Sequence, residues 1–389
     1  MSLRSLRNSL FIAFTVAAAF YVAADKHQSA KAATSTPQGV TYQKYQRSYF
    51  PNTEQLAANE MRITALGTGM LTVAYNNAAA SFLVELGNGD KFIFDFGAGA
   101  MERLAALQLD YNDTDKVFIG HLHTDHAGDL SVFLIGGWFT RYKPLHVYGP
   151  SAPSLEHGIK AHVEHLMKAW DWDISSRIGT LPDAGGRMVA HEHDYSKTTV
   201  IYNQNGVQVT AFPAVHIRDG ASSCRLDWKG ISFVFSSDTE PNKWYLKEAK
   251  NADVAVHGTW PTAEGWANIT GMAEKYASFV VNTIHTAPQA FGKIMSQAEP
   301  RLAVAYHYWN HRDLEFDILA GIRETYDGPL AMAADLTVIN VTPDHIAVRQ
   351  MSPDPTGWPQ RASEEFNASP RSDRQKGLMS DWLREGIRR

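Results

Sequence analysis

The chain has 389 residues, 44% hydrophobic and 20% charged, a globular composition long enough for one large domain or two small ones. Its formal net charge of −5 excludes the strongly basic balance of a nucleic-acid-binding domain. Its single cysteine, Cys224, excludes an internal disulfide framework and a cysteine-rich zinc knuckle.

Residues 1–32 predict a signal peptide. Arg4 and Arg7 precede the uncharged apolar run LFIAFTVAAAFYVAA, which is too short for a comfortable membrane span. Ala30-Lys31-Ala32 supplies a small-x-small cleavage site. We therefore expect a periplasmic or secreted protein without a stable membrane span after signal cleavage. The alternative is an uncleaved N-terminal membrane anchor.

A polar linker is expected at 33–60, and the pattern then becomes regular. Short apolar runs bounded by turn residues predict strands, and spaced apolar residues predict helices. In this part of the chain the predicted strands are 61–67, 80–87, 91–97, 116–120 and 145–150, and the predicted helices are 101–109 and 129–139. The continuous run 116–120 is typical of a strand that is buried on both faces.

Residues 151–198 change character, with one helical stretch at 155–170 followed by loop-rich sequence, and we expect an insertion or lid there. Strand patterns then return. They comprise hairpins at 198–212 and 222–238, strands at 251–258, 301–307, 336–341 and 345–351, and helices at 241–250, 287–298 and 315–326. The two β-rich halves, 61–149 and 199–349, predict a sheet-on-sheet sandwich covered by helices within a domain at 61–350. A polar tail is expected at 351–389.

The segment HLHTDH, directly after the predicted strand 116–120, concentrates potential metal ligands. In an extended segment His121 and His123 point the same way, so their imidazoles can hold one divalent metal. Asp125 and His126 offer an oxygen and a nitrogen to a second ion nearby. Mixed N/O ligation favours zinc, with manganese or iron as alternatives.

Two metal ions need further ligands, and three residues that end apolar runs are candidates. His216 ends TAFPAVH, Asp238 ends ISFVFSSD and His307 ends RLAVAYH. Strand ends would deliver all three side chains to one rim of the sandwich. For Asp238 the alternative is an N-cap role before the helix at 241–250.

These motifs resemble the metallo-β-lactamase-fold hydrolases, over roughly 61–345 of the chain. The resemblance implies an α/β, four-layer αββα sandwich with two zinc ions per chain. One ion would be held by His121, His123 and His216, and the other by Asp125, His126 and His307, with Asp238 bridging. Asp95 in FDFGAG would support the motif loop.

LGTG at 66–69, SSDTEPN, HTAPQAFGKI and VAYHYW narrow the resemblance to the ribonuclease Z and arylsulfatase-like branch. In that branch a histidine protonates the leaving group, and His285 matches it, so His285 and Asp125 are the expected catalytic residues. A loop or helix-start role is the alternative for His285. His191 and His193 form an HxH pattern that we interpret as a surface loop, and His157, His162 and His165 are interpreted as helix residues.

The substrate is less determined than the chemistry. The enzymes of this fold that hydrolyse β-lactams typically lack an aspartate at the position of Asp238, so a β-lactam substrate is not favoured. An exported protein would not meet precursor tRNA, which argues against ribonuclease Z activity. The insertion carries five basic and seven acidic residues, whereas an RNA-clamping arm needs a positive excess. Trp138, Trp260 and Trp309 near the predicted rim favour an apolar pocket, although each could simply pack under a loop.

We therefore expect an exported dinuclear zinc hydrolase in which a metal-bridging hydroxide cleaves a small, partly apolar ester. The ester would be a phosphodiester, sulfate ester, carboxylic ester or lactone, and a nucleic-acid partner is not expected. The alternatives are a ribonuclease Z-like phosphodiesterase acting on RNA, a mononuclear iron oxygenase, or a non-catalytic binding protein of the same fold. Assembly as a homodimer is left open.

Overall fold

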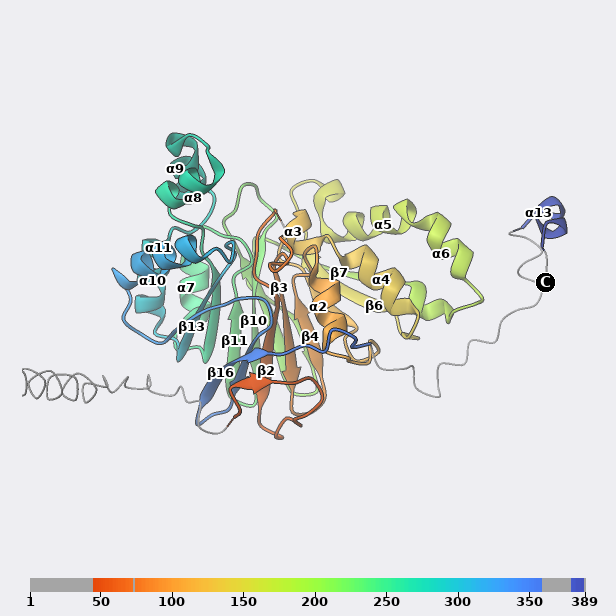
Figure 1. Cartoon of the computed structure of the whole chain (residues 1–389), viewed down its shortest axis with the longest axis horizontal. Coiled ribbons are helices and arrows are strands. Elements are labelled where there is room, and N and C mark those ends of the chain that lie inside the picture. The colour runs from red at the N-terminus through yellow and green to blue at the C-terminus, as the bar shows by residue number, and fades with distance from the viewer. Residues whose placement is uncertain (1–44, 73, 359–378, 388–389) are drawn as a thin grey trace, which may run out of the picture. The chain divides into compact units, whose positions relative to one another are not determined.

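Two β-sheets packed face to face form the centre of this computed structural model, which describes residues 45–72, 74–358 and 379–387 (Figure 1). The predicted signal peptide lies outside the described residues. In sheet order, the first sheet contains β1 (Ser48–Tyr49), β16 (Ile346–Met351), β15 (Thr337–Val341), β2 (Met61–Gly67), β3 (Ser81–Leu86), β4 (Lys91–Phe94), β5 (Lys116–Phe118), β6 (Leu145–Pro150) and β7 (Met188–His193). The second contains β14 (Leu330–Met332), β13 (Leu302–Tyr306), β12 (Val254–Gly258), β11 (Ile231–Phe235), β10 (Ser222–Trp228), β9 (Val207–Pro213) and β8 (Thr199–Gln204).

The continuous apolar strands are buried because both of their faces are covered. In β4, Phe92 and Phe94 enter the core between the sheets, whereas Ile93 points to the outer face of the first sheet. In β11, Phe233 enters the same inner core. The rings of Phe94 and Phe233 meet across the two sheets with centroids 5.1 Å apart. Alternation along each strand therefore supplies one inner core and two outer cores.

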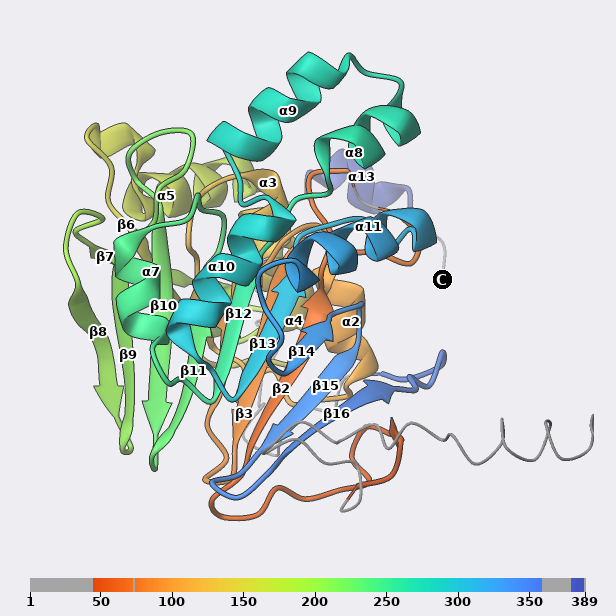
Figure 2. The same cartoon turned by 90° about the vertical axis from the view of Figure 1, so that its left-hand side faces the viewer.

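Helices cover both outer faces, which confirms the predicted α/β sandwich (Figure 2). On the first sheet, α2 (Ala100–Ala106), α4 (Leu130–Trp138) and α5 (Ile159–Ala169) pack their apolar sides onto the strands. On the second, α7 (Lys243–Ala249), α10 (Pro288–Ala298) and α11 (Arg312–Arg323) do the same. Amphipathic spacing explains α5, α10 and α11, in which one stripe is buried and the opposite side is polar, whereas α4 is apolar nearly all round.

A pair of helices that the sequence patterns did not reveal, α8 (Ala263–Thr270) and α9 (Glu274–Thr283), extends beyond the strands of the second sheet (Figure 2). Trp266 and Val280 attach the pair to the second outer core. The remaining helical segments are α3 (Thr124–Ala127), η1 (Leu155–His157), α6 (Asp171–Arg177), η2 (Asp183–Gly186) and α13 (Asp381–Glu385). Among the described residues, none of the helices is both long and apolar enough to cross a membrane.

The segment 151–198 is more regular than the loop-rich lid that we expected. It contains η1, α5, α6 and η2, and it ends in β7, which pairs in parallel with β6 at the edge of the first sheet. The edge strand was missed because MVAHEH lacks a continuous apolar run, and only one of its faces needs to be apolar. The segment is therefore partly a structural extension of the sheet.

Two predicted boundaries also differ. The last hairpin, β15–β16, belongs to the first sheet, because β15 pairs with β2. The sequence pattern grouped it with the second β-rich half, 199–349. Ile339 and Val341 fill the inner core from that position. Within the expected linker, β1 pairs with β16 and buries Tyr49, so the described part of 33–60 packs against the sheet.

Candidate metal centre

Four strand ends place seven side chains at one rim of the sandwich. Parallel pairing brings the carboxyl ends of β4, β5 and β6 to the same edge of the first sheet, and those of β11, β12 and β13 to one edge of the second. The turn after β5 and the short helix α3 carry His121, His123, Asp125 and His126, while His216, Asp238 and His307 follow β9, β11 and β13. The hydrogen bond from Glu240 N to Val215 O, 2.7 Å, joins the loops of two of these residues.

The seven side chains form two ligand groups in which all donor atoms lie within 4.8 Å of one another. The first group is His121, His123, His216 and Asp238, and the second is Asp125, His126, His307 and Asp238. These are the sets that the family resemblance implied, with Asp238 shared between them. Asn242, which accepts a hydrogen bond from Tyr245 N, caps α7, so Asp238 has no capping role there. Metal ligation by each residue stays a prediction.

In the first group, outer partners orient the imidazoles so that nitrogen lone pairs converge. His121 Nδ1 donates to Ser237 Oγ at 3.2 Å, and His216 Nδ1 donates to Ile284 O at 3.1 Å. The free Nε2 of His121 then lies 2.9 Å from His123 Nδ1, and the Nε2 of His216 lies 3.4 Å from that same atom. Lone pairs this close repel one another unless a cation or a proton lies between them, which fits a metal site.

The second group is buried more deeply and contains carboxylates as well as imidazoles. His126 Nε2 lies 3.3 Å from His307 Nε2, and His307 Nε2 lies 3.4 Å from Asp125 Oδ2. Asp238 Oδ1 lies 3.2 Å from His307 Nε2 but has no hydrogen-bond partner among the described residues. A buried carboxylate oxygen without a hydrogen bond is costly, and a bound cation would satisfy it.

Asp95 connects the two groups from below. Its Oδ2 accepts hydrogen bonds from His126 Nδ1 at 2.6 Å and from Ser237 Oγ at 2.8 Å, and its Oδ1 accepts the Gly120 N–H at 2.7 Å. This arrangement sets the tautomer of His126 and, through Ser237, that of His121. Sequence reasoning anticipated the supporting role of Asp95 but missed Ser237 and the Ile284 carbonyl. The only signal for Ser237 was its position beside Asp238.

Burial and mutual proximity shift the pKa values of these groups. Burial, together with the neighbouring His126, lowers the pKa of His121 well below its ordinary value, and burial also lowers the pKa values of His123 and His216. Burial opposes ionisation of Asp125, but the His126 and His307 imidazoles outweigh it and lower its pKa to about 2. Burial opposes protonation of His126, but the carboxylates of Asp238, Asp95 and Asp125 outweigh it and raise the pKa of this imidazole well above its ordinary value. A divalent metal would take the place of that proton beside the ionised Asp125.

His285, the expected proton donor, lies in the loop before α10 and faces the same cluster. Its Nδ1 is 3.7 Å from Asp238 Oδ2, and its ring stacks on the Trp260 indole with centroids 3.8 Å apart. Burial lowers the pKa of His285 to about 3, so the ring is neutral at pH 7 and can offer an N–H hydrogen bond. Its catalytic role stays a prediction.

An apolar cavity of 580 Å³, here called the aromatic pocket, opens onto the metal centre. Trp260 and Trp309 line it as expected, and Trp266 adds a third indole. The helix α9 contributes the opposite wall through Tyr276 and Val280. The helices α8 and α9, and not the expected lid or insertion at 151–198, therefore line this pocket.

Trp138 does not line this pocket, and its expected role in substrate binding is wrong. The side chain is fully buried with Leu134 and Ile174, and its Nε1 donates to Pro182 O at 2.6 Å. A Cβ atom on Gly186 would come within 2.5 Å of the indole ring, so a glycine is needed there. Trp138 follows the metal-binding helix in sequence but points away from the rim because it lies on the core side of α4.

The remaining histidines have structural surroundings that differ from our expectation. His191 and His193 lie on β7 rather than in a surface loop. His191 Nε2 contacts His146 Nδ1 at 2.9 Å, and His193 Nε2 contacts Ser222 Oγ at 3.1 Å. His162 lies on α5 as expected.

Comparisons with known proteins agree with this geometry. The family model described as "Anti-Pycsar protein Apyc1" matches residues 61–265, more than half of the chain. Ribonuclease Z of Mycobacterium marinum is 32% identical over 203 residues, which cover 51% of this chain and 70% of that protein.

Two solved structures show the same fold. Human tRNase Z, short form, has a TM-score of 0.54 at 18% identity and covers 72% of this chain and 98% of its own. The Zn²⁺-bound PqqB of Methylobacterium extorquens has a TM-score of 0.50 at 10% identity and covers 72% and 99%.

Proposed function

Because this chain belongs to the metallo-β-lactamase-fold hydrolases, in the group that contains Apyc1 and ribonuclease Z, we propose that it is an exported dinuclear zinc esterase for small, partly apolar substrates. The coarser assignment, a metal-dependent hydrolase acting on ester bonds, follows from the family. Phosphodiesters are the first substrate class to test, since the ribonuclease Z relatives are named for cleaving RNA.

One observation carries the proposal of two metals, namely the position of Asp238 in both ligand groups. Its Oδ1 faces His307 and His126 at 3.2 and 3.4 Å, while its Oδ2 faces His216 at 3.8 Å. A carboxylate with one oxygen toward each group is suited to bridge two cations. Zinc is proposed because imidazole and carboxylate ligands suit it, and because the PqqB structure of the same fold is described as Zn²⁺-bound.

Two zinc ions, when bound, supply an activated water at neutral pH and a Lewis acid for the ester oxygen. The side chains of this protein would orient the water and the leaving group. The ionised Asp125 accepts a proton or a hydrogen bond at the rim of the aromatic pocket, which it helps to line. His285 lies on the wall of the same pocket and donates its N–H toward the leaving oxygen, held flat by Trp260.

The surroundings of the metal centre favour a small substrate. The aromatic pocket has the size of a small-molecule site, and its walls are mainly indole, phenol and aliphatic side chains. An RNA substrate is the second candidate, favoured by the ribonuclease Z relatives. The excess of acidic over basic residues in 151–198 argues against clamping a polyanion there.

Export is proposed from the sequence of residues 1–32 alone, which the structure does not describe. N-terminal sequencing of protein from a periplasmic or culture fraction tests it. A new N-terminus just after Ala32 is the expected result, and an intact Met1 in the membrane fraction would contradict cleavage.

Elemental analysis combined with a chromogenic ester panel tests the activity. The panel contains bis(p-nitrophenyl) phosphate, an aryl sulfate, an acyl ester, a lactone and nitrocefin. The purified mature protein should contain close to two zinc ions per chain and hydrolyse at least one of these compounds. His121→Ala and Asp238→Ala should lose both bound zinc and turnover, whereas the control His191→Ala on β7 should retain them. One iron per chain would support the oxygenase, and full hydrolysis without metal would refute the proposal.

A further inference from the structure

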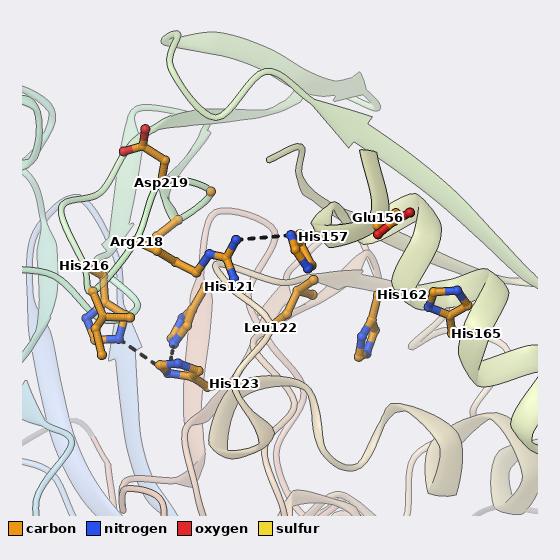
Figure 3. Close-up of a pocket in the computed structure, with 13 residues that line it drawn as sticks. His121, Leu122, His123, Glu156, His157, His162, His165, His216, Arg218 and Asp219 are labelled. Atoms are coloured by element: carbon orange, nitrogen blue, oxygen red, sulfur yellow. Dashed lines mark hydrogen bonds between the residues drawn. The ribbon is translucent and has the colours of Figure 1, made fainter. Parts of the chain in front are cut away.

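A second cavity, of 330 Å³, opens onto the metal centre on the other side of His123 and His216 (Figure 3). We call it the imidazole pocket, because six histidines line it: His121, His123, His157, His162, His165 and His216. It shares Leu122, His123, His216 and Ile217 with the aromatic pocket, so these four residues form the wall between the two. A ligand held at the metal centre can therefore reach into both cavities.

Arg218 and His162 bring nitrogen atoms to the imidazole pocket. Arg218 extends its guanidinium to His157, with Nη2 3.1 Å from Nδ1 (Figure 3). The Arg218 side chain is exposed, and among the described residues no carboxylate forms an ion pair with it. His162 contributes a buried Nε2 that has no hydrogen-bond partner among the described residues. A buried nitrogen without a hydrogen bond and a guanidinium without an ion pair both favour an oxygen-bearing ligand.

The two carboxylates of the pocket are directed elsewhere. Asp219 turns away from the Arg218 guanidinium, and its Oδ2 accepts a hydrogen bond from Tyr195 Oη at 3.4 Å (Figure 3). Glu156 lies on the side of the view away from His121, His123 and His216 (Figure 3). Neither carboxylate therefore neutralises the guanidinium, which lies close to the centre of the pocket.

We propose that the imidazole pocket is an anion subsite that selects substrates by a second negative group, a carboxylate or a phosphate. The inference rests on the proposed function, since it places the scissile ester at the metal centre between the two pockets. The apolar part of the substrate enters the aromatic pocket, and the anionic part pairs with Arg218, His157 and His162. The substrate class is accordingly an amphipathic ester with one apolar arm and one anionic arm.

The arrangement of charge agrees with this assignment. A bidentate guanidinium contact to a planar carboxylate or a phosphate is geometrically specific as well as strong. The position of Arg218, two residues after His216, links the subsite directly to the metal centre. Arg218 is itself exposed, so its charge alone would contribute little, and the subsite needs the buried Nε2 of His162 as a second contact.

Calorimetric titration with three phosphonate monoesters, in which a P–C bond replaces the P–O bond to the leaving group, tests the subsite without requiring turnover. The ligands are phenylphosphonate esters of benzyl alcohol, 4-carboxybenzyl alcohol and 4-(aminomethyl)benzyl alcohol, added to the zinc-loaded protein. We expect the carboxylate ligand to bind at least about tenfold more tightly than the neutral one. The substitution Arg218→Ala should remove that ratio, and Arg177→Ala on α6, which deletes the same charge away from the pocket, should keep it.

The hydrolysable counterparts separate this inference from the proposed function. They are 4-nitrophenyl phosphodiesters of the neutral and carboxylate alcohols, in which water adds to phosphorus and 4-nitrophenolate leaves. Tighter binding of the carboxylate phosphonate with no hydrolysis of either diester refutes phosphodiester cleavage and leaves the subsite. Equal binding of all three ligands, tighter binding of the amine, or a carboxylate preference that survives Arg218→Ala overturns the subsite.

Discussion

The Nδ1 atom of His126 donates a 2.6 Å hydrogen bond to Asp95 Oδ2, and this contact turns the Nε2 lone pair of His126 toward His307. The same carboxylate holds Ser237 and the Gly120 amide. Asp95 has φ of +54°, a left-handed backbone conformation that is uncommon for an aspartate and occurs often at functional sites. Both ligand groups thus depend on one side chain beneath them.

Asp95→Asn should weaken metal binding without unfolding the protein. The amide cannot accept from His126, Ser237 and Gly120 together, so the tautomers of His126 and His121 are no longer set. We expect a loss of about 10- to 100-fold in metal affinity, measured by competition with a chelator of known affinity. Asp113→Asn, at an exposed carboxylate paired with Lys91, is the matched control. Unchanged affinity in Asp95→Asn would show that the ligands orient themselves.

Trp309→Ala should impair the binding of apolar esters. Trp309 lines the aromatic pocket, and its Nε1 donates to Thr72 O at 3.1 Å on the facing loop. Loss of the indole removes about 2 kcal/mol of apolar contact, which predicts a KM raised by about tenfold or more in steady-state assays. Trp172→Ala, on α6 where the side chain is 83% exposed, should leave KM unaltered. An equal rise in both variants would count against the pocket.

Trp138→Ala should destabilise the fold and leave substrate affinity unchanged. The buried indole packs with Leu134 and Ile174, and its replacement leaves a cavity and an unpaired Pro182 carbonyl. We expect the free energy of unfolding to fall by about 3 to 5 kcal/mol, measured by urea denaturation. A raised KM in the folded variant, with little loss of stability, would restore the substrate-binding role that the structure contradicts.

His193 should make the stability of the protein depend on pH. Burial lowers its pKa to about 4, below the ordinary value of 6.5, so the unfolded chain binds a proton that the folded protein excludes. Above about pH 6.5 His193 does not reduce the free energy of unfolding, because the imidazole is neutral in both states. As the pH falls toward 4, the free energy of unfolding decreases, by about 2 kcal/mol between pH 7 and pH 5.

The substitution His193→Gln should reduce this loss, because glutamine can still contact Ser222 Oγ but does not titrate. Urea denaturation at pH 7 and pH 5 measures the difference. His165→Gln, at an exposed position on α5, serves as the control. An identical pH dependence in wild type and His193→Gln would place the titrating group elsewhere.

Much of the site could be located from the sequence because its residues follow buried strands. HLHTDH is a local motif. His216, Asp238 and His307 each end an apolar run, and such runs predict buried strands. The order of the strands, their double burial and the family resemblance are likewise properties of the sequence pattern. The sandwich and the hydrolase family were therefore predictable before any coordinates.

The outer elements were less predictable because they depend on a single buried face. The edge strand β7 has the pattern MVAHEH, and the helices α8 and α9 are short and mixed in composition. The sequence does not distinguish Trp138 from Trp309, because each follows a segment that carries predicted metal ligands. Only their rotation about the local backbone decides that one fills a core and the other lines a pocket.

The sequence by itself determined the metal-binding chemistry and the strands that carry it, since ligand types and apolar runs are local features. The tertiary structure decided how Asp95 and Ser237 set the imidazole tautomers and which walls enclose the centre. It also joined Arg218 and His157, 61 residues apart, in the imidazole pocket. These are contacts between segments far apart in the chain, and their formation depends on the packing of whole sheets and helices rather than on local propensity.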